Sequence, residues 1–135
     1  MMTKQKTIKE SFTLKGKGLH SGVVTTLTFH PAPNNFGRRI KRVDLAGAPE
    51  IEALAENVVE TSRGTVIAKG EAKVSTIEHA MAALYAFGVD NCLMEVDGPE
   101  FPILDGSAAY YVEALERVGT EEQSADRDYF VVHER

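Results

Sequence analysis

The chain has 135 residues, of which 43% are hydrophobic and 26% are charged, a composition that predicts one globular domain with a hydrophobic core. The net charge of -5 argues against nucleic acid as the main partner, because binding phosphates requires a basic surface. The single cysteine, Cys92, excludes an internal disulfide and a cysteine-based zinc site, and no apolar stretch approaches the roughly 18 residues of a membrane-spanning helix.

The first part of the chain predicts strands on either side of a glycine-rich loop. The lysines that begin the sequence precede no apolar run, so we expect no secretory signal and a cytoplasmic location. Ile8, Phe12 and Leu14 alternate with polar residues, which predicts a strand. The loop at residues 16–22 contains three glycines, and the Val- and Thr-rich segment Val23–His30 predicts the next strand. Because the loop leads into a strand rather than a helix, it is not a dinucleotide-binding fingerprint.

A basic stretch follows a proline-rich turn. Residues 31–35 are typical of a turn, and the four basic residues within 38–42 belong to a third predicted strand. These residues fit the solvated edge of a sheet, where charges discourage pairing with other chains, or alternatively a weak phosphate contact. Further short strands are predicted near residues 50–53, 58–61 and 65–68.

The hydrophobic period then changes to that of a helix. Ser75, with Glu78 three residues later, has the pattern of a capping box. We therefore expect a helix from about Thr76 to Phe87, ended by Gly88.

The remaining elements alternate between strand and helix. They are a strand at residues 91–96, a loop at 98–102, an Asp105-Gly106 turn, a helix capped by Ser107 that runs through Val118 with Gly119 beyond it, and a strand at 128–133. The two helices come late, after most of the strands. This order predicts an α+β fold, a two-layer sandwich in which a mainly antiparallel sheet has two helices packed on one face.

The first helix has two faces of different composition. The expected core face carries Ile77, Ala80, Met81, Leu84 and Phe87. The opposite face carries His79, Ala82, Ala83 and Ala86, where a helix facing water would carry charged residues. We therefore expect a missing second domain of the same polypeptide, or else a partner subunit, to pack on the alanine face of helix 76–87. The strand pattern at the end of the chain favours the first option and indicates that residues 1–135 are one domain of a longer protein.

Glu78 and His79 are adjacent at the start of this helix. Each has an ordinary explanation, Glu78 as a capping residue and His79 as a packed, hydrogen-bonded histidine. Together they also suit a zinc hydrolase, because catalytic zinc takes three protein ligands plus water and an adjacent Glu can act as the general base. The other histidines have no ligand spacing to His79, so the residues alone indicate a partial metal site at most.

Four segments, in order along the chain, carry a family resemblance. They are residues 16–22, 55–59, 75–84 (Ser-Thr-Ile-Glu-His-Ala-Met-Ala-Ala-Leu) and 90–108. Together they resemble the UDP-3-O-acyl-N-acetylglucosamine deacetylases, the zinc enzymes of the committed step of lipid A synthesis. The segment at 75–84 resembles the signature helix of that family. The resemblance covers nearly the whole chain, and it is specific because the four motifs occur together.

The resemblance implies a two-domain enzyme whose helical layers pack together, with this chain as the N-terminal domain. It implies that Glu78 is the general base and that His79 is a Zn2+ ligand. The other two ligands, a His and an Asp, and the groups that stabilise or protonate the reacting atoms would lie in the second domain. The implied reaction is hydrolysis of the acetamide of an acylated UDP-amino-sugar, in which zinc polarises the carbonyl and Glu78 takes a proton from the attacking water.

Further roles follow from the same resemblance. Leu19 and His20 lie on a loop that resembles one bordering the active site, and Thr61 lies on a segment that borders the substrate, so we expect all three to contact substrate. Asp105 is expected to orient the site, unless it only forms an Asp-Gly turn. Two segments depart from the family pattern: Ser21 stands where Thr is common, and residues 61–64 are more polar than in many members of the family. Some members of the family are fused to a β-hydroxyacyl dehydratase.

Two other functional classes stay open. The chain could be a non-catalytic α+β binding or interaction module that uses its alanine face as an interface, or a generic metal-free domain. Whatever the function of the whole protein, we expect these 135 residues alone to be inactive and to bind zinc poorly, because one imidazole cannot supply a tetrahedral site. An uncovered alanine face would also cause self-association of the fragment.

Overall fold

The computed structural model describes residues 3–54, 57–61, 64–70 and 72–127, so the strand predicted at 128–133 lies outside the described residues. The main sheet has five strands in the order β2-β3-β9-β4-β5. Their bounds are β2 Phe12–Lys17, β3 Val24–Pro31, β9 Cys92–Val96, β4 Arg38–Arg42 and β5 Glu50–Glu52. Adjacent strands are antiparallel except β4 and β9, which run parallel. The strand β9, which comes late in the sequence, lies between the early strands β3 and β4.

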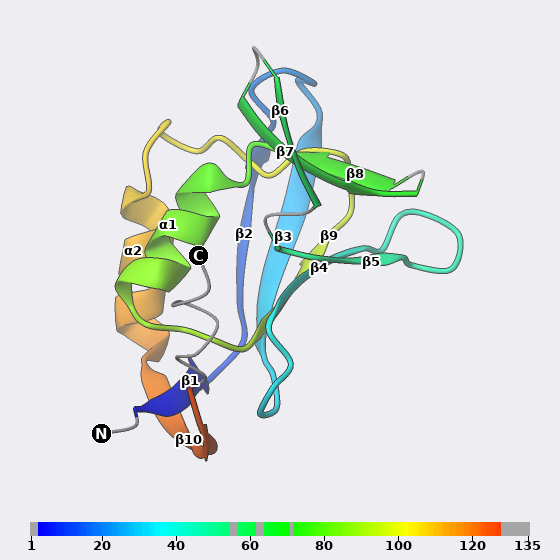
Figure 1. Cartoon of the computed structure of the whole chain (residues 1–135). Coiled ribbons are helices and arrows are strands. Elements are labelled where there is room, and N and C mark those ends of the chain that lie inside the picture. The colour runs from blue at the N-terminus through cyan, green and yellow to red at the C-terminus, as the bar shows by residue number, and fades with distance from the viewer. Residues whose placement is uncertain (1–2, 55–56, 62–63, 71, 128–135) are drawn as a thin grey trace.

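Two helices and two smaller sheets complete the described part of the fold. The helices are α1 (Glu78–Ala86) and α2 (Ala109–Val118); the smaller sheets are β6-β7-β8 (Val58–Thr61, Gly64–Lys69, Ala72–Ser75) and β1-β10 (Lys4–Ile8, Thr120–Asp126). Figure 1 shows α1 and α2 side by side along one face of the main sheet, with β6-β7-β8 at the top of the view and β1-β10 at the bottom. The predicted α+β fold, with a mainly antiparallel sheet and two helices on one face, is confirmed.

The core lies between the main sheet and the helices. Alternate residues of β3 and β9 are buried, as the period of a strand requires. Phe29 of β3 stacks on Phe12 with ring centroids 4.5 Å apart and meets the edge of Tyr111 of α2 at 6.0 Å. Each fully buried side chain of this kind contributes roughly 1.5–3 kcal/mol relative to an exposed one. None of the described helices is long and apolar enough to cross a membrane.

The early strands differ from the sequence-based expectation in one respect. Residues 8–14 do not form a single strand, because Ile8 ends β1 and Phe12 begins β2 in a different sheet. Between them, the Lys9 N–H donates to the carbonyl of Gly119 at 3.0 Å, so the chain leaves one sheet before it joins the other. Both apolar residues are buried, which explains why their spacing looked like a single strand.

The predicted solvated edge at residues 38–42 is wrong. β4 is hydrogen-bonded to β9 on one side and to β5 on the other. Arg42 is buried and forms a two-pronged pair with Asp44, at 2.8 and 2.7 Å, and it donates to the carbonyl of Lys73. Its charge is therefore compensated inside the protein. The alternative phosphate contact stays a prediction.

The helix α1 begins at Glu78, so the predicted capping box is wrong. Ser75 is the last residue of β8, the N-cap position is Ile77, and no side chain caps the helix. The capping pattern of Ser75 hides the strand β8 in the sequence, because Ser75 is in fact the last residue of that strand. Gly88, with φ of +69°, ends the helix as predicted. The second helix begins at Ala109 with Ala108, rather than the predicted Ser107, at the N-cap position, and the Ser107 hydroxyl accepts the Ala109 N–H at 3.1 Å.

The two faces of α1 are partly as predicted. Ala80 and Leu84 are buried, and Met81 and Phe87 are half-buried against the core. Ala83, expected on the outer face, is buried against the core instead. Ala82 and Ala86 are exposed, and Tyr85 between them is 78% exposed. The outer face is therefore narrower than predicted, but it carries a large aromatic side chain.

Asn91 joins the β1-β10 ribbon to the rest of the protein. Its amide is 1% exposed and donates to the side-chain oxygens of Gln5 and Gln123, at 2.8 Å each. Its own oxygen accepts the Gly37 N–H at 2.8 Å. One side chain thus satisfies three polar groups from different elements.

We expect Asn91→Ala to lower the free energy of unfolding by roughly 2–4 kcal/mol, because it removes three hydrogen bonds of a buried side chain, although Gln5 Oε1 keeps the Asn35 N–H. Asn57→Ala is the matched control, since the Asn57 amide makes a single exposed hydrogen bond to the Glu52 carbonyl; its loss should be under about 1 kcal/mol. Urea denaturation of both variants measures the difference. Equal losses would show that Asn91 is not a structural junction.

Candidate active site at the start of helix α1

Two backbone contacts and one side chain fix the start of α1. The Ser75 N–H donates to the Pro99 carbonyl and the Thr76 N–H donates to the Thr65 carbonyl, both at 3.0 Å. Thr76 then has φ of +61°, a left-handed conformation that a β-branched residue rarely adopts and that costs on the order of 1–3 kcal/mol. Its hydroxyl donates to a Glu100 oxygen at 2.5 Å. These contacts fix the direction in which the chain enters α1, whose first two residues are Glu78 and His79.

Glu78, the first residue of α1, has one oxygen in an unusual environment. Its side-chain Oε1 is buried, and within the described residues it has no hydrogen-bond partner. Burial raises the pKa of the nearby Tyr111 hydroxyl, and the negative charge of Glu78 raises it further. A buried carboxylate oxygen without a donor is costly, so such groups are found mainly where function requires them.

His79 is half-buried and lies within electrostatic reach of Asp105. The pKa of Asp105 is lowered mainly because the Ser107 hydroxyl and N–H donate to it, at 2.8 and 3.0 Å, and to a smaller extent by the charge of His79. Asp105 lies in a turn in which Leu104 and Gly106 both have positive φ. The predicted turn is therefore present, and it also brings Asp105 near His79.

A metal ion would find few ligands in this part of the protein. Among the residues that the structure describes, no group of three or more His, Cys, Asp or Glu side chains could hold one. His79 therefore offers one imidazole, and a complete tetrahedral site needs ligands from elsewhere.

The glycine-rich loop lies against the same site through Glu100. The His20 N–H donates to both Glu100 oxygens at 3.1 Å, and the Ser21 N–H donates to Oε1 at 2.8 Å. Leu19, at 58% exposure, projects from this loop into solvent. Thr61 is the last residue of β6, where its backbone pairs with Gly64; the predicted substrate contact of its side chain stays a prediction.

Glu100 itself is 1% exposed. Burial alone would raise the pKa of this carboxyl, but hydrogen bonds from Thr76, Ser21 and His20 outweigh burial and lower the pKa below its ordinary value. No role is predicted for Glu100 from the sequence. The available signal was a lone charged residue between apolar and proline residues in the segment Gly98-Pro99-Glu100-Phe101-Pro102.

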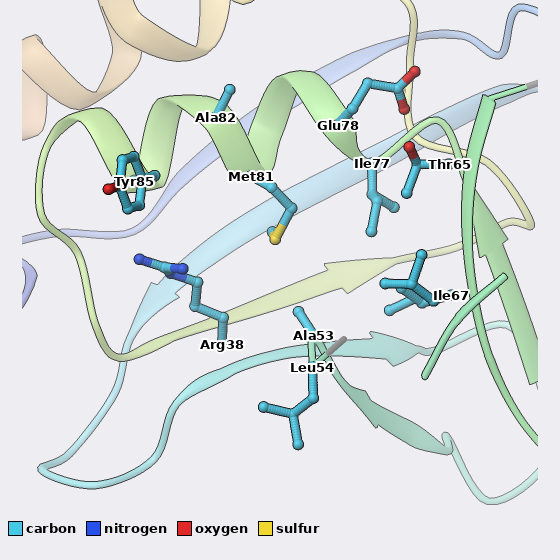
Figure 2. Close-up of a pocket in the computed structure, with 11 residues that line it drawn as sticks. Arg38, Ala53, Leu54, Thr65, Ile67, Ile77, Glu78, Met81, Ala82 and Tyr85 are labelled. Carbon is cyan, nitrogen blue, oxygen red and sulfur yellow. The ribbon is translucent and has the colours of Figure 1, made fainter. Parts of the chain in front are cut away.

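A groove of about 450 Å³ runs beneath α1 and was also missed by the sequence analysis. Figure 2 shows Met81 pointing down from the helix toward Ala53 and Leu54, with Glu78 and Thr65 near one end and Arg38 and Tyr85 near the other. Burial lowers the pKa of the Arg38 guanidinium, which donates to the Val89 carbonyl at 2.8 Å. The lining is mostly apolar, with one acidic and one basic group at opposite ends.

Comparison with known proteins gives consistent matches. A family model described as UDP-3-O-acyl N-acetylglycosamine deacetylase matches residues 5–135. The bifunctional enzyme LpxC/FabZ of Bacteroides thetaiotaomicron is 64% identical over 131 residues, which is 97% of this chain and 28% of that protein. The UDP-3-O-acyl-N-acetylglucosamine deacetylase of Citrifermentans bemidjiense is 50% identical over 128 residues, which is 95% of this chain and 42% of that protein. The chain thus spans well under half the length of these relatives.

We expect Gly18→Ala to destabilise the site. A Cβ at this position would lie 2.3 Å from Glu100 Oε1 and 2.6 Å from Ser21 Oγ, and the carboxylate cannot move aside without losing its donors. The free energy of unfolding should fall by about 1–3 kcal/mol. Gly16→Ala is the control, because its Cβ would meet only Pro102 and Leu104 carbons, at 3.2 and 3.3 Å. Thermal or urea unfolding that ranks the two variants in the opposite order would refute this account.

Proposed function

The chain belongs to the UDP-3-O-acyl N-acetylglycosamine deacetylase family, and on this basis we propose that it is the N-terminal part of a zinc-dependent hydrolase. The proposed reaction removes acetate from UDP-3-O-acyl-N-acetylglucosamine, in the committed step of lipid A synthesis. One observation carries the proposal: Glu78 and His79 are adjacent at the start of α1, and one Glu78 oxygen is buried without a partner among the described residues.

Glu78 acts as the general base in this proposal. A carboxylate at this position can take a proton from the attacking water. Because Oε1 is buried and has no partner among the described residues, we assign the contact with that water to the second oxygen, Oε2.

His79 supplies one ligand for the zinc ion. The imidazole fits this role because zinc commonly binds neutral histidine nitrogens, and the nearby Asp105 carboxylate can orient the ring. Zinc, when bound, polarises the acetamide carbonyl and lowers the pKa of water. The other ligands, a His and an Asp, and the acid that protonates the leaving amine are proposed to come from a second domain. Leu19, His20 and Thr61 are proposed to contact the substrate.

The second domain is proposed to cover the outer face of α1. Ala82 and Ala86 are small enough to allow close approach, and Tyr85 offers a large apolar surface that is 78% exposed. Without that cover, the fragment would self-associate. A cytoplasmic location is part of the proposal, and the lone, buried thiol of Cys92 suits a reducing compartment.

The test compares variants of the natural full-length protein. His79→Ala should lose both its zinc and acetate release, because a metal ligand is removed. Glu78→Gln should keep its zinc, while the rate of acetate release falls by about 10²–10⁴-fold, because the amide cannot take a proton. Zinc analysis and an acetate assay on the acylated UDP-amino-sugar measure both effects.

Glu116→Gln, the same change at an exposed position on α2, is the control and should match the wild type. A wild-type protein without zinc or acetate release would favour the alternative of a non-catalytic binding module. If Glu78→Gln alone kept full activity, the deacetylase would need another base.

A further inference from the structure

The Glu100 carboxylate contacts two segments of the proposed site at once. It accepts the N–H groups of His20 and Ser21 from the glycine-rich loop and the hydroxyl of Thr76 from the approach to α1. Its backbone adds further ties, because residue 100 forms a parallel bridge with Ser75 and its carbonyl accepts the Thr25 hydroxyl at 3.1 Å.

We infer that Glu100 is a positioning residue, which holds the loop of Leu19 and His20 in a fixed relation to the helix start that carries Glu78 and His79. The consequence for catalysis rests on the function proposed above, whereas the mechanical coupling of the two segments does not. Glu100 acts through the two segments that it holds and not by contact with the reacting atoms.

Thr76 shows why the coupling matters. Its positive φ is unfavourable for a β-branched residue and persists only where surrounding contacts enforce it. The hydroxyl contact to Glu100 is one of these contacts, and the N–H contact to Thr65 is another. When the carboxylate is lost, the backbone can relax toward negative φ, which changes the direction of the chain two residues before Glu78.

The loop depends on the same carboxylate. The oxygens of Glu100 receive the N–H groups of His20 and Ser21 from the loop, and the carboxylate fits there because Gly18 has no Cβ, which would lie 2.3 Å from Oε1. The carboxylate is charged at neutral pH, because these donors hold its pKa below the ordinary value. A shorter or apolar side chain would leave the two N–H groups without their acceptor.

Glutamine is the informative substitution. Its single carbonyl oxygen can still accept from the loop, and its NH2 group can donate to the Thr76 hydroxyl, which is able to accept. Glu100→Gln should therefore fold but hold the two segments less tightly, whereas Glu100→Ala removes all of these contacts. Because glutamine has nearly the volume of glutamate, a loss already in Glu100→Gln separates positioning from mere filling of space, and Glu100→Ala should lose more.

The first experiment measures kinetics in the natural full-length protein. In Glu100→Gln, we expect kcat for acetate release to fall at least tenfold while zinc content stays at the wild-type level and the protein remains folded at the assay temperature. Glu95→Gln is the control: Glu95 undergoes the same change of side chain, but it is only half-buried and pairs with His30, at 2.9 Å, away from the site. Wild-type kcat in Glu100→Gln, or an equal decrease in the control, would overturn the inference.

A double-mutant cycle tests the contact itself. Thr76→Val removes the hydroxyl with little change of shape, so it should lower kcat in the same direction as Glu100→Gln. When Thr76→Val is combined with Glu100→Ala, the double variant should be no slower than Glu100→Ala alone, because the alanine has already removed the contact that the valine removes. Strictly multiplicative effects on kcat would overturn the coupling.

Amide hydrogen exchange gives a readout that does not need activity. In Glu100→Gln and Glu100→Ala, the amides of His20 and Ser21 and those at the start of α1 should lose protection together, while amides of β3 keep theirs. If the wild type released no acetate, the proposed function would fail and this measurement would still decide the coupling. Unchanged protection in both variants would refute it.

Discussion

The arrangement of the site depends on one constraint: a charged carboxylate that is buried must be surrounded by donors. Glu100 meets this constraint with N–H groups from one segment and a hydroxyl from another, so its burial brings the two segments together. The local conformations follow from this requirement. Gly18 must lack a side chain, and Thr76 must adopt a backbone conformation that it would otherwise avoid. The positions of these two segments are thus set by hydrogen bonds to a charged side chain that is distant in sequence, rather than by the local conformational preferences of their residues.

The same constraint explains what could be predicted from the sequence. Local signals gave the alternation of β3 and β9, the end of α1 at Gly88, and the adjacent pair of Glu78 and His79. The start of α1 could not be predicted correctly, because Ser75 has a local pattern typical of capping but is claimed by a strand. Ser75 is held in the strand partly by the carbonyl of Pro99, 24 residues away along the chain, and no local sequence pattern reveals that partner.

Elements that depend on distant partners were missed for a related reason. The strand β10 is mostly polar and has no apolar alternation, and it forms because β1 offers an edge for backbone pairing. Glu100 was overlooked because a charged residue in a loop normally faces water. The basic residues of β4 misled in the opposite direction: Arg42 is buried, and its charge is balanced by Asp44 just beyond the strand. In each case the conformation or burial of the residue depends on a partner that only the folded structure brings into contact.

The place of β9 in the main sheet has a consequence for how the protein folds. β3 and β4 are separated by only a short turn, yet they are not neighbours, because β9 lies between them. During synthesis the first half of the chain therefore cannot close its own sheet, and the central position stays vacant until the residues after α1 have emerged. Closure of the parallel β4–β9 pair joins residues about fifty positions apart, and such non-local pairing slows folding. The start of α1 is therefore completed late, because Glu100, which accepts the Thr76 hydroxyl, follows β9 in the chain.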